Sequence, residues 1–93
     1  MHCLRLLTLL LALQSAPVIA VLHNHEVMLA VQFGNVIYAA EFSRQELKPD
    51  SFIDGDRVEA EVKRGKMKVR RKDGKVVIGR VISEQRVVVH PIP

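Results

Sequence analysis

The strongest constraint on the fold is an alternating segment, residues 57–70, with Arg64-Gly65 near its centre. Apolar residues occupy every second position on both sides of that pair: Val58, Ala60, Val62, Met67 and Val69. A period of two predicts strands, and the two-residue connection predicts a hairpin. Its cross-strand pairs are Val62–Met67 and Ala60–Val69 inside, with Glu61–Lys68 and Glu59–Arg70 outside. A one-residue slip would turn every side chain over, so this part is committed to a half-buried antiparallel sheet.

A second hairpin is predicted upstream. Two apolar runs, residues 25–33 and 36–42, flank Gly34-Asn35, which is a hairpin turn sequence. The pairing across this turn is Val31 with Tyr38, Leu29 with Ala40, and Val27 with Phe42. Both faces are largely apolar, so we expect both to be covered, as in a curled barrel strand or a dimer interface.

Asp73-Gly74 predicts a third turn, leading into a strand over residues 76–82. A two-residue turn would point Val76, Ile78 and Arg80 inward, whereas a three-residue loop with a bulge would point Val77, Gly79 and Val81 inward. We favour the second register because it leaves Arg80 in solvent. Residues 83–85 are predicted to be a last turn, followed by a short final strand over residues 87–90.

The link between the two alternating regions contains a helix-start pattern. Ser43 and Glu46 have the spacing of a capping box, and Pro49 disfavours helical geometry just before it. We therefore predict one helical turn over residues 44–48. Phe52 and Ile53 follow, and both are expected to enter the core.

The sequence of residues 52–62, Phe-Ile-Asp-Gly-Asp-Arg-Val-Glu-Ala-Glu-Val, resembles the turn-into-strand element of small barrels of the OB-fold and SH3-like kinds. The predicted fold is accordingly all-β: a five- to six-stranded antiparallel meander curled into a small barrel with one short helical turn. The aromatic binding-face residues of OB-fold nucleic-acid binders have no matching positions here. No aromatic residue follows Phe52, so we do not expect nucleic acid as a partner.

The first twenty residues are predicted to be a cleavable signal peptide. Arg5 precedes an apolar run over residues 6–13, and Val18 and Ala20 occupy the −3 and −1 positions of a cut after Ala20. The apolar run is too short for a spanning anchor, which disfavours that alternative. The predicted organisation is residues 1–20 signal peptide, residues 21–24 flexible arm, and residues 25–93 barrel domain. We expect an exported protein, periplasmic or extracellular, without a membrane span after cleavage and without its single cysteine, Cys3.

Charge is divided unevenly along the chain. Residues 21–56 hold two basic and six acidic side chains, whereas residues 57–80 hold ten basic and three acidic ones. Eight of these cations are candidate ligands for an anionic partner: Lys63, Arg64, Lys66, Lys68, Arg70, Arg71, Lys72 and Lys75. The alternative is a solvated strand face whose lysines and arginines are neutralised by Glu59 and Glu61.

A cut after Ala20 would also create a new amino terminus, Val21-Leu22-His23. The amine of Val21, two backbone amides and the His23 imidazole have the spacing of the amino-terminal copper- and nickel-binding motif, and His25 could add a donor. Four nitrogens in one plane suit Cu(II) or Ni(II). The alternative is that both histidines are ordinary polar residues of an arm.

No arrangement of nucleophile, base and orienting group is evident, and we expect no enzyme and no other cofactor. The predicted role is a non-catalytic binding or accessory module of the cell envelope or secreted space, with a protein or anionic envelope component as partner. Two alternatives stay open. One is a basic module docking on anionic polymer or lipid, and the other is a structural homo-oligomer built through the first hairpin.

Overall fold

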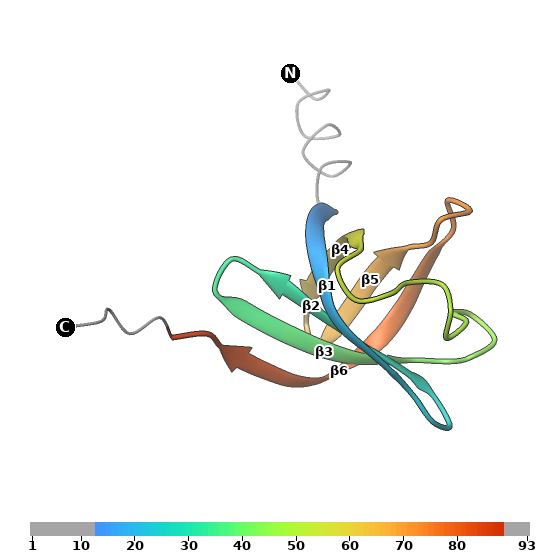
Figure 1. Cartoon of the computed structure of the whole chain (residues 1–93), viewed down its shortest axis with the longest axis horizontal. Coiled ribbons are helices and arrows are strands. Elements are labelled where there is room, and N and C mark those ends of the chain that lie inside the picture. Colours follow the sequence, from blue (N-terminus) through green and yellow to red (C-terminus); the bar gives the residue numbers. More distant parts are fainter. Residues whose placement is uncertain (1–12, 89–93) are drawn as a thin grey trace, which may run out of the picture.

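The computed structural model describes residues 13–88, which form a closed antiparallel barrel of six strands (Figure 1). The strands are β1 (Gln14–His23), β2 (Val27–Phe33), β3 (Val36–Phe42), β4 (Arg57–Lys63), β5 (Lys66–Arg70) and β6 (Val76–Arg86). The predicted all-β barrel is confirmed. No helix is found among residues 13–88. This described range therefore contains no helix that could span a membrane.

The barrel consists of two three-stranded meanders, β1–β2–β3 and β4–β5–β6. Residues 43–56 cross between them, so that β3 pairs with β6 and β4 pairs with β1. Closure depends on the long first strand, which bends across the barrel in Figure 1. Its first part, Gln14 to Pro17, pairs with β4, and its later part, Val18 to His23, pairs with β2 in a ladder whose register shifts between Val18 and Ala20.

All three predicted hairpin registers are confirmed. In β2–β3, Val31 faces Tyr38 and Val27 faces Phe42 across a turn that has Gly34 at a φ of 60°. In β4–β5, Ala60 faces Val69 and Val62 faces Met67. In β5–β6, the bulged loop places Val77 opposite Val69 and Gly79 opposite Met67. Arg80 accordingly points into solvent.

The crossing segment, residues 43–56, corrects two expectations. The predicted helical turn is a hydrogen-bonded turn without a helix: the N–H groups of Glu46 and Leu47 donate to the Ser43 carbonyl at 3.0 and 2.8 Å. Pro49 stops it before a second turn forms. Phe52 is buried as predicted, but Ile53 is 65% exposed, because only one of these neighbours can point into the barrel.

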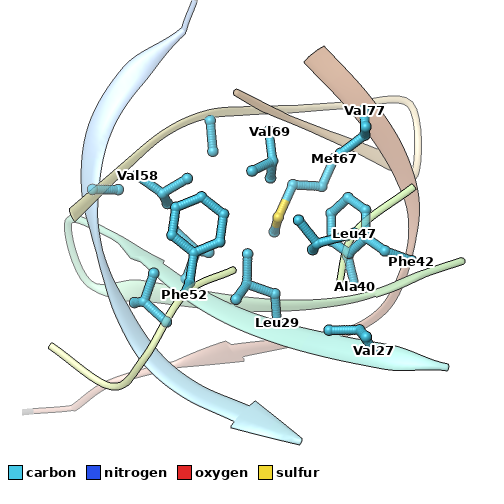
Figure 2. Packing of buried hydrophobic residues seen from close by; sticks show 14 residues of the cluster. Val27, Leu29, Ala40, Phe42, Leu47, Phe52, Val58, Met67, Val69 and Val77 are labelled. Atoms are coloured by element: carbon cyan, nitrogen blue, oxygen red, sulfur yellow. The ribbon is translucent and has the colours of Figure 1, made fainter. Parts of the chain in front are cut away.

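A single aliphatic core fills the barrel interior. Figure 2 shows Leu29, Met67 and Val69 pointing inward from the wall, while Phe52 and Leu47 from the crossing segment reach in among them. No polar or charged side chain among the described residues is buried. This packing explains why the alternation of residues 57–70 sets the register: one face of each strand is committed to the core.

The last strand is longer than predicted. Residues 83–85, expected to form a turn, continue β6 and pair with β3, with Ser83 opposite Ala39 and Gln85 opposite Ile37. A local bulge in this ladder lets the strand run on. The predicted final strand over residues 87–90 is not seen at Val87 and Val88, and its remainder lies outside the described residues.

The first strand was not predicted. Residues 21–23, expected in a flexible arm, complete β1, and residues 14–20, expected in the signal peptide, form its beginning. Ala16 and Val18 are core residues, 2% and 1% exposed. The Val18 N–H donates to the Asp56 carbonyl at 2.7 Å, and its own carbonyl accepts from Gly55 at 2.8 Å. Residues 1–12 of the predicted signal lie outside the described range.

Candidate functional site

The candidate cations lie mainly on the outer face of β4–β5–β6. The core takes alternate residues from each strand, so the residues between them must face solvent. On β5 this exposes Lys66, Lys68 and Arg70, while Met67 and Val69 are buried. The alternation of the strands therefore places the charged residues of β5 on the outer face of the sheet.

The structure divides the eight predicted cations into two groups at opposite ends of β5. The basic tip comprises the residues at and beside the β4–β5 turn: Lys63, Arg64, Lys66 and Lys68. The far group comprises the residues toward the β5–β6 turn: Arg70, Arg71, Lys72 and Lys75. The eight cations form one set in the sequence, and in the structure they divide between the β4–β5 turn and the β5–β6 turn.

Carboxylates accompany most of the far group. Arg70 Nε lies 3.3 Å from a Glu59 carboxylate oxygen, and Lys72 Nζ lies 3.4 Å from Asp56. Arg71 pairs with Asp73 and also donates to the Glu46 carbonyl at 2.9 Å, which ties the β5–β6 turn to the crossing segment. Lys72 also lies 5.6 Å from the centre of the buried Phe52 ring. These contacts make the far group part of the fold.

Backbone hydrogen bonds favour the charged form of two of these carboxylates, Asp56 and Asp73. The N–H of Ile53 donates to Asp56 at 3.0 Å and lowers the pKa of Asp56, and Lys72 lowers it further. The N–H of Lys75 donates to Asp73 at 3.1 Å and lowers the pKa of Asp73, with Arg71 adding to the effect. For both aspartates, the hydrogen bond within the turn is the largest single cause of the lowered pKa.

The basic tip is different, because none of its four cations forms an ion pair with a carboxylate of residues 13–88. Lys63 and Lys66 lie directly opposite one another, a like-charge pair that disfavours strand pairing. Glu61 lies opposite Lys68 on the sheet without a direct ion pair. The tip is thus a concentration of positive charge without a direct ion pair to the described part of the chain.

The turn at the basic tip also departs from local preference. Arg64 and Gly65 have φ values of 53° and 76°, the positive pair of a type I′ turn. Asn or Gly favours the first of these positions, because a bulkier L-residue is strained at positive φ. The tip encloses one side of an open hollow of about 280 Å³, lined by Lys63, Arg64, Lys66, Lys68 and Ile78.

Sequence reasoning did not assign a role to the aliphatic residues beside these cations. Val76 and Ile78 are 46% and 52% exposed on the outer face of β6, opposite Arg70 and Lys68 respectively. The sequence does contain an indication of them, the run Val76-Val77-Ile78. If Val77 points into the core, the aliphatic residues on either side of it must point outward. The site is therefore amphiphilic as well as cationic.

The residues of the predicted copper or nickel site, Val21, His23 and His25, lie in β1 and in the turn between β1 and β2. Val21 is an internal residue of β1 opposite Leu29, so it offers a free amine only if the chain is cut at Ala20. His23 and His25 line an open hollow of about 480 Å³ at the β1–β2 turn, together with Glu41 and Arg80, which pair at 2.9 Å. No group of three metal-ligating side chains is found in the described part of the chain. The copper or nickel prediction thus applies to a cut chain, and that chain would lack Ala16 and Val18 from its core.

Comparison of the chain with protein-family models, with curated proteins and with solved structures gives no match.

Proposed function

We propose that this protein is a non-catalytic binding module that docks through its basic tip on an anionic component of the cell envelope or secreted space. The observation that carries the proposal is the contrast between the ends of β5. Arg70, Arg71 and Lys72 have carboxylate partners, whereas Lys63, Arg64, Lys66 and Lys68 form no ion pair within residues 13–88.

Two features of the basic tip disfavour folding and add no stabilising contact. A like-charge pair and an arginine at positive φ both oppose hairpin formation. Sequences that break local rules in this way do so most often at functional sites. Concentrated cations attract phosphate or carboxylate groups through a field that salt screens over about 10 Å at 0.1 M.

The test compares two triple variants that remove the same charge. Lys63, Lys66 and Lys68 are changed to Gln in one, and Lys48, Lys72 and Lys75 are changed to Gln in the other. On a heparin column, the wild type and the second variant should be retained at low salt and released as salt rises. The first variant should pass through. Equal retention of the two variants would refute a localised tip site.

A structural homo-oligomer remains the second proposal. It would use the outer face of β2–β3, where Met28, Ala30 and Ile37 are partly exposed. Sedimentation mass that rises with protein concentration and is unchanged in the first triple variant would favour it over docking.

A further inference from the structure

An aliphatic row runs beside the cations of the candidate site. Val76, Ile78 and Ile82 lie on the outward side of β6 and are 46%, 52% and 45% exposed. The outward residues of β5 face this row directly, with Arg70 opposite Val76, Lys68 opposite Ile78 and Lys66 opposite Arg80. One surface therefore carries a line of cations next to a row of branched aliphatic side chains, which Arg80 interrupts between Ile78 and Ile82.

The presence of both cations and aliphatic side chains on this surface favours one class of anionic partner over another. A hydrated acidic polymer offers carboxylate or phosphate groups to the lysines but nothing that gains from contact with Ile78. A lipid bilayer with acidic headgroups offers both, because headgroup phosphates lie immediately above an apolar layer. The lysine stems are long enough to reach the headgroups while Ile78 enters the interface between them.

We propose that the partner of this surface is an anionic lipid bilayer, with the basic tip in the headgroup layer and Val76 and Ile78 inserted beneath it. This inference rests on the proposed function, since it takes anionic docking through the tip as given. The hollow lined by Lys63, Arg64, Lys66, Lys68 and Ile78 is where a headgroup phosphate would lie.

Tryptophan substitution tests the insertion directly, because the chain has no tryptophan of its own. Ile78→Trp places a reporter in the aliphatic row, at a position that is 52% exposed, and Ile53→Trp places one in the crossing segment, at an aliphatic position that is 65% exposed. With vesicles of phosphatidylcholine and phosphatidylglycerol, emission from the Ile78→Trp protein should shift to the blue, and emission from the Ile53→Trp protein should not. Equal behaviour of the two reporters would overturn the insertion geometry.

Separate variants distinguish failure of this inference from failure of the proposed function. The double variant Val76→Thr and Ile78→Thr keeps every charge and the β-branched shape. It should bind phosphatidylglycerol vesicles about tenfold more weakly while keeping its heparin retention. Replacing Lys66 and Lys68 by Gln should weaken vesicle binding by about fivefold per lysine and also reduce heparin retention.

Unchanged vesicle binding by the threonine variant would overturn the lipid inference and leave anionic docking intact. Absence of wild-type binding to vesicles with retention on heparin would also overturn it, in favour of a polymer. Absence of wild-type binding to both would overturn the proposed function itself.

A second inference comes independently from β1. Residues 14–17 close the barrel against β4, and the core includes Ala16 and Val18. A cut after Ala20 would remove those residues and leave the edges of β2 and β4 unpaired over that length.

We infer that the folded protein retains residues 14–20, so that any removal of a leader occurs upstream of Gln14. The test is the amino-terminal residue of the exported, folded protein, measured by intact mass. A terminus at or before Gln14 supports the inference, and a folded protein that begins at a later residue, such as Val21, overturns it.

Two neighbouring substitutions provide an independent readout. Val18 is 1% exposed and Ile19 is 40% exposed on the opposite side of the strand. Val18→Asn should lower the melting temperature of the protein by more than about 10 °C, whereas Ile19→Asn should change it by a few degrees. If residues 14–20 were missing from the folded protein, the two variants would melt alike.

Discussion

The β2–β3 and β4–β5 hairpins have two-residue turns of the same size but different chemistry. Gly34-Asn35 places glycine at the position of positive φ, and the strands beside it are apolar. Arg64-Gly65 places arginine there, between Lys63 and Lys66. The first turn follows the local preferences that favour folding. The second departs from them, and the departure marks the part of the surface where a role other than folding is expected.

The largest effects should be the same in both hairpins, because they share one core. Leu29 from β2 and Met67 from β5 are both fully buried. Leu29→Ala and Met67→Ala should each lower the free energy of unfolding by about 2–5 kcal/mol. Urea denaturation should show a single transition for each variant. A biphasic curve, with one hairpin melting first, would show that the two are not a single cooperative unit.

The next effect concerns the contact between the two meanders. A Cβ at Gly79 of β6 would lie 2.7 Å from the Glu41 carbonyl and 2.7 Å from the Phe42 ring of β3. Since neither the backbone nor the buried ring can move freely, Gly79→Ala should cost about 1–3 kcal/mol. Ile78→Ala, one residue away and exposed, is the matched control and should cost much less. Equal effects would mean that β3 and β6 can move apart to accommodate a methyl group.

The turns themselves should respond in opposite directions. Arg64→Asn relieves the strain at positive φ and should stabilise the protein by about 0.5–1 kcal/mol, whereas Gly34→Ala introduces it and should destabilise by about 1 kcal/mol. Heparin retention should fall in the first variant and be unchanged in the second. A destabilising Arg64→Asn would show that this arginine serves the fold, and the contrast between the two turns would then lose its meaning.

The smallest effect is that of pH. Asp56 and Asp73 have pKa values held below the ordinary 3.8 by backbone hydrogen bonds and by Lys72 and Arg71. A lowered folded-state pKa contributes stability above the unfolded pKa, and that contribution disappears as pH falls through the folded value. Thermal melts from pH 6 down to about pH 2 should therefore show a loss that is smaller in the Asp56→Asn and Asp73→Asn variants. An identical loss in those variants would place the acid sensitivity elsewhere.

Local patterns were sufficient to predict most of the sheet. The registers of β2–β3, β4–β5 and β5–β6 follow from period-two alternation and short turns, which involve residues close in sequence. The pairings that were missed are long-range. Residues 83–85 look like a turn until β3 lies beside them, and the strand formed by residues 14–20 is evident only when β4 and β2 lie beside it. An apolar strand start and a cleavage region share the same small and branched residues.

The candidate site was predicted in composition but not in arrangement. Its cations are evident from the sequence, but the partners that separate them into two groups come from distant segments. Arg71 is fixed by Glu46 and Lys72 by Asp56, both in the crossing segment. The aliphatic row was missed because an exposed isoleucine has no signature until its inward neighbours are known.

Because β1 pairs with both β2 and β4, the barrel can close only after β4 has formed. β1 is synthesised first, but its partner residues 57–60 in β4 are synthesised only after both β2 and β3. Contacts so far apart in sequence form slowly, and closure is expected to be among the last steps of folding. Until then residues 14–17 and the facing edge of β4 remain unpaired. A chain that has not yet completed β4 therefore leaves exposed two residues, Ala16 and Val18, that the finished barrel buries in its core.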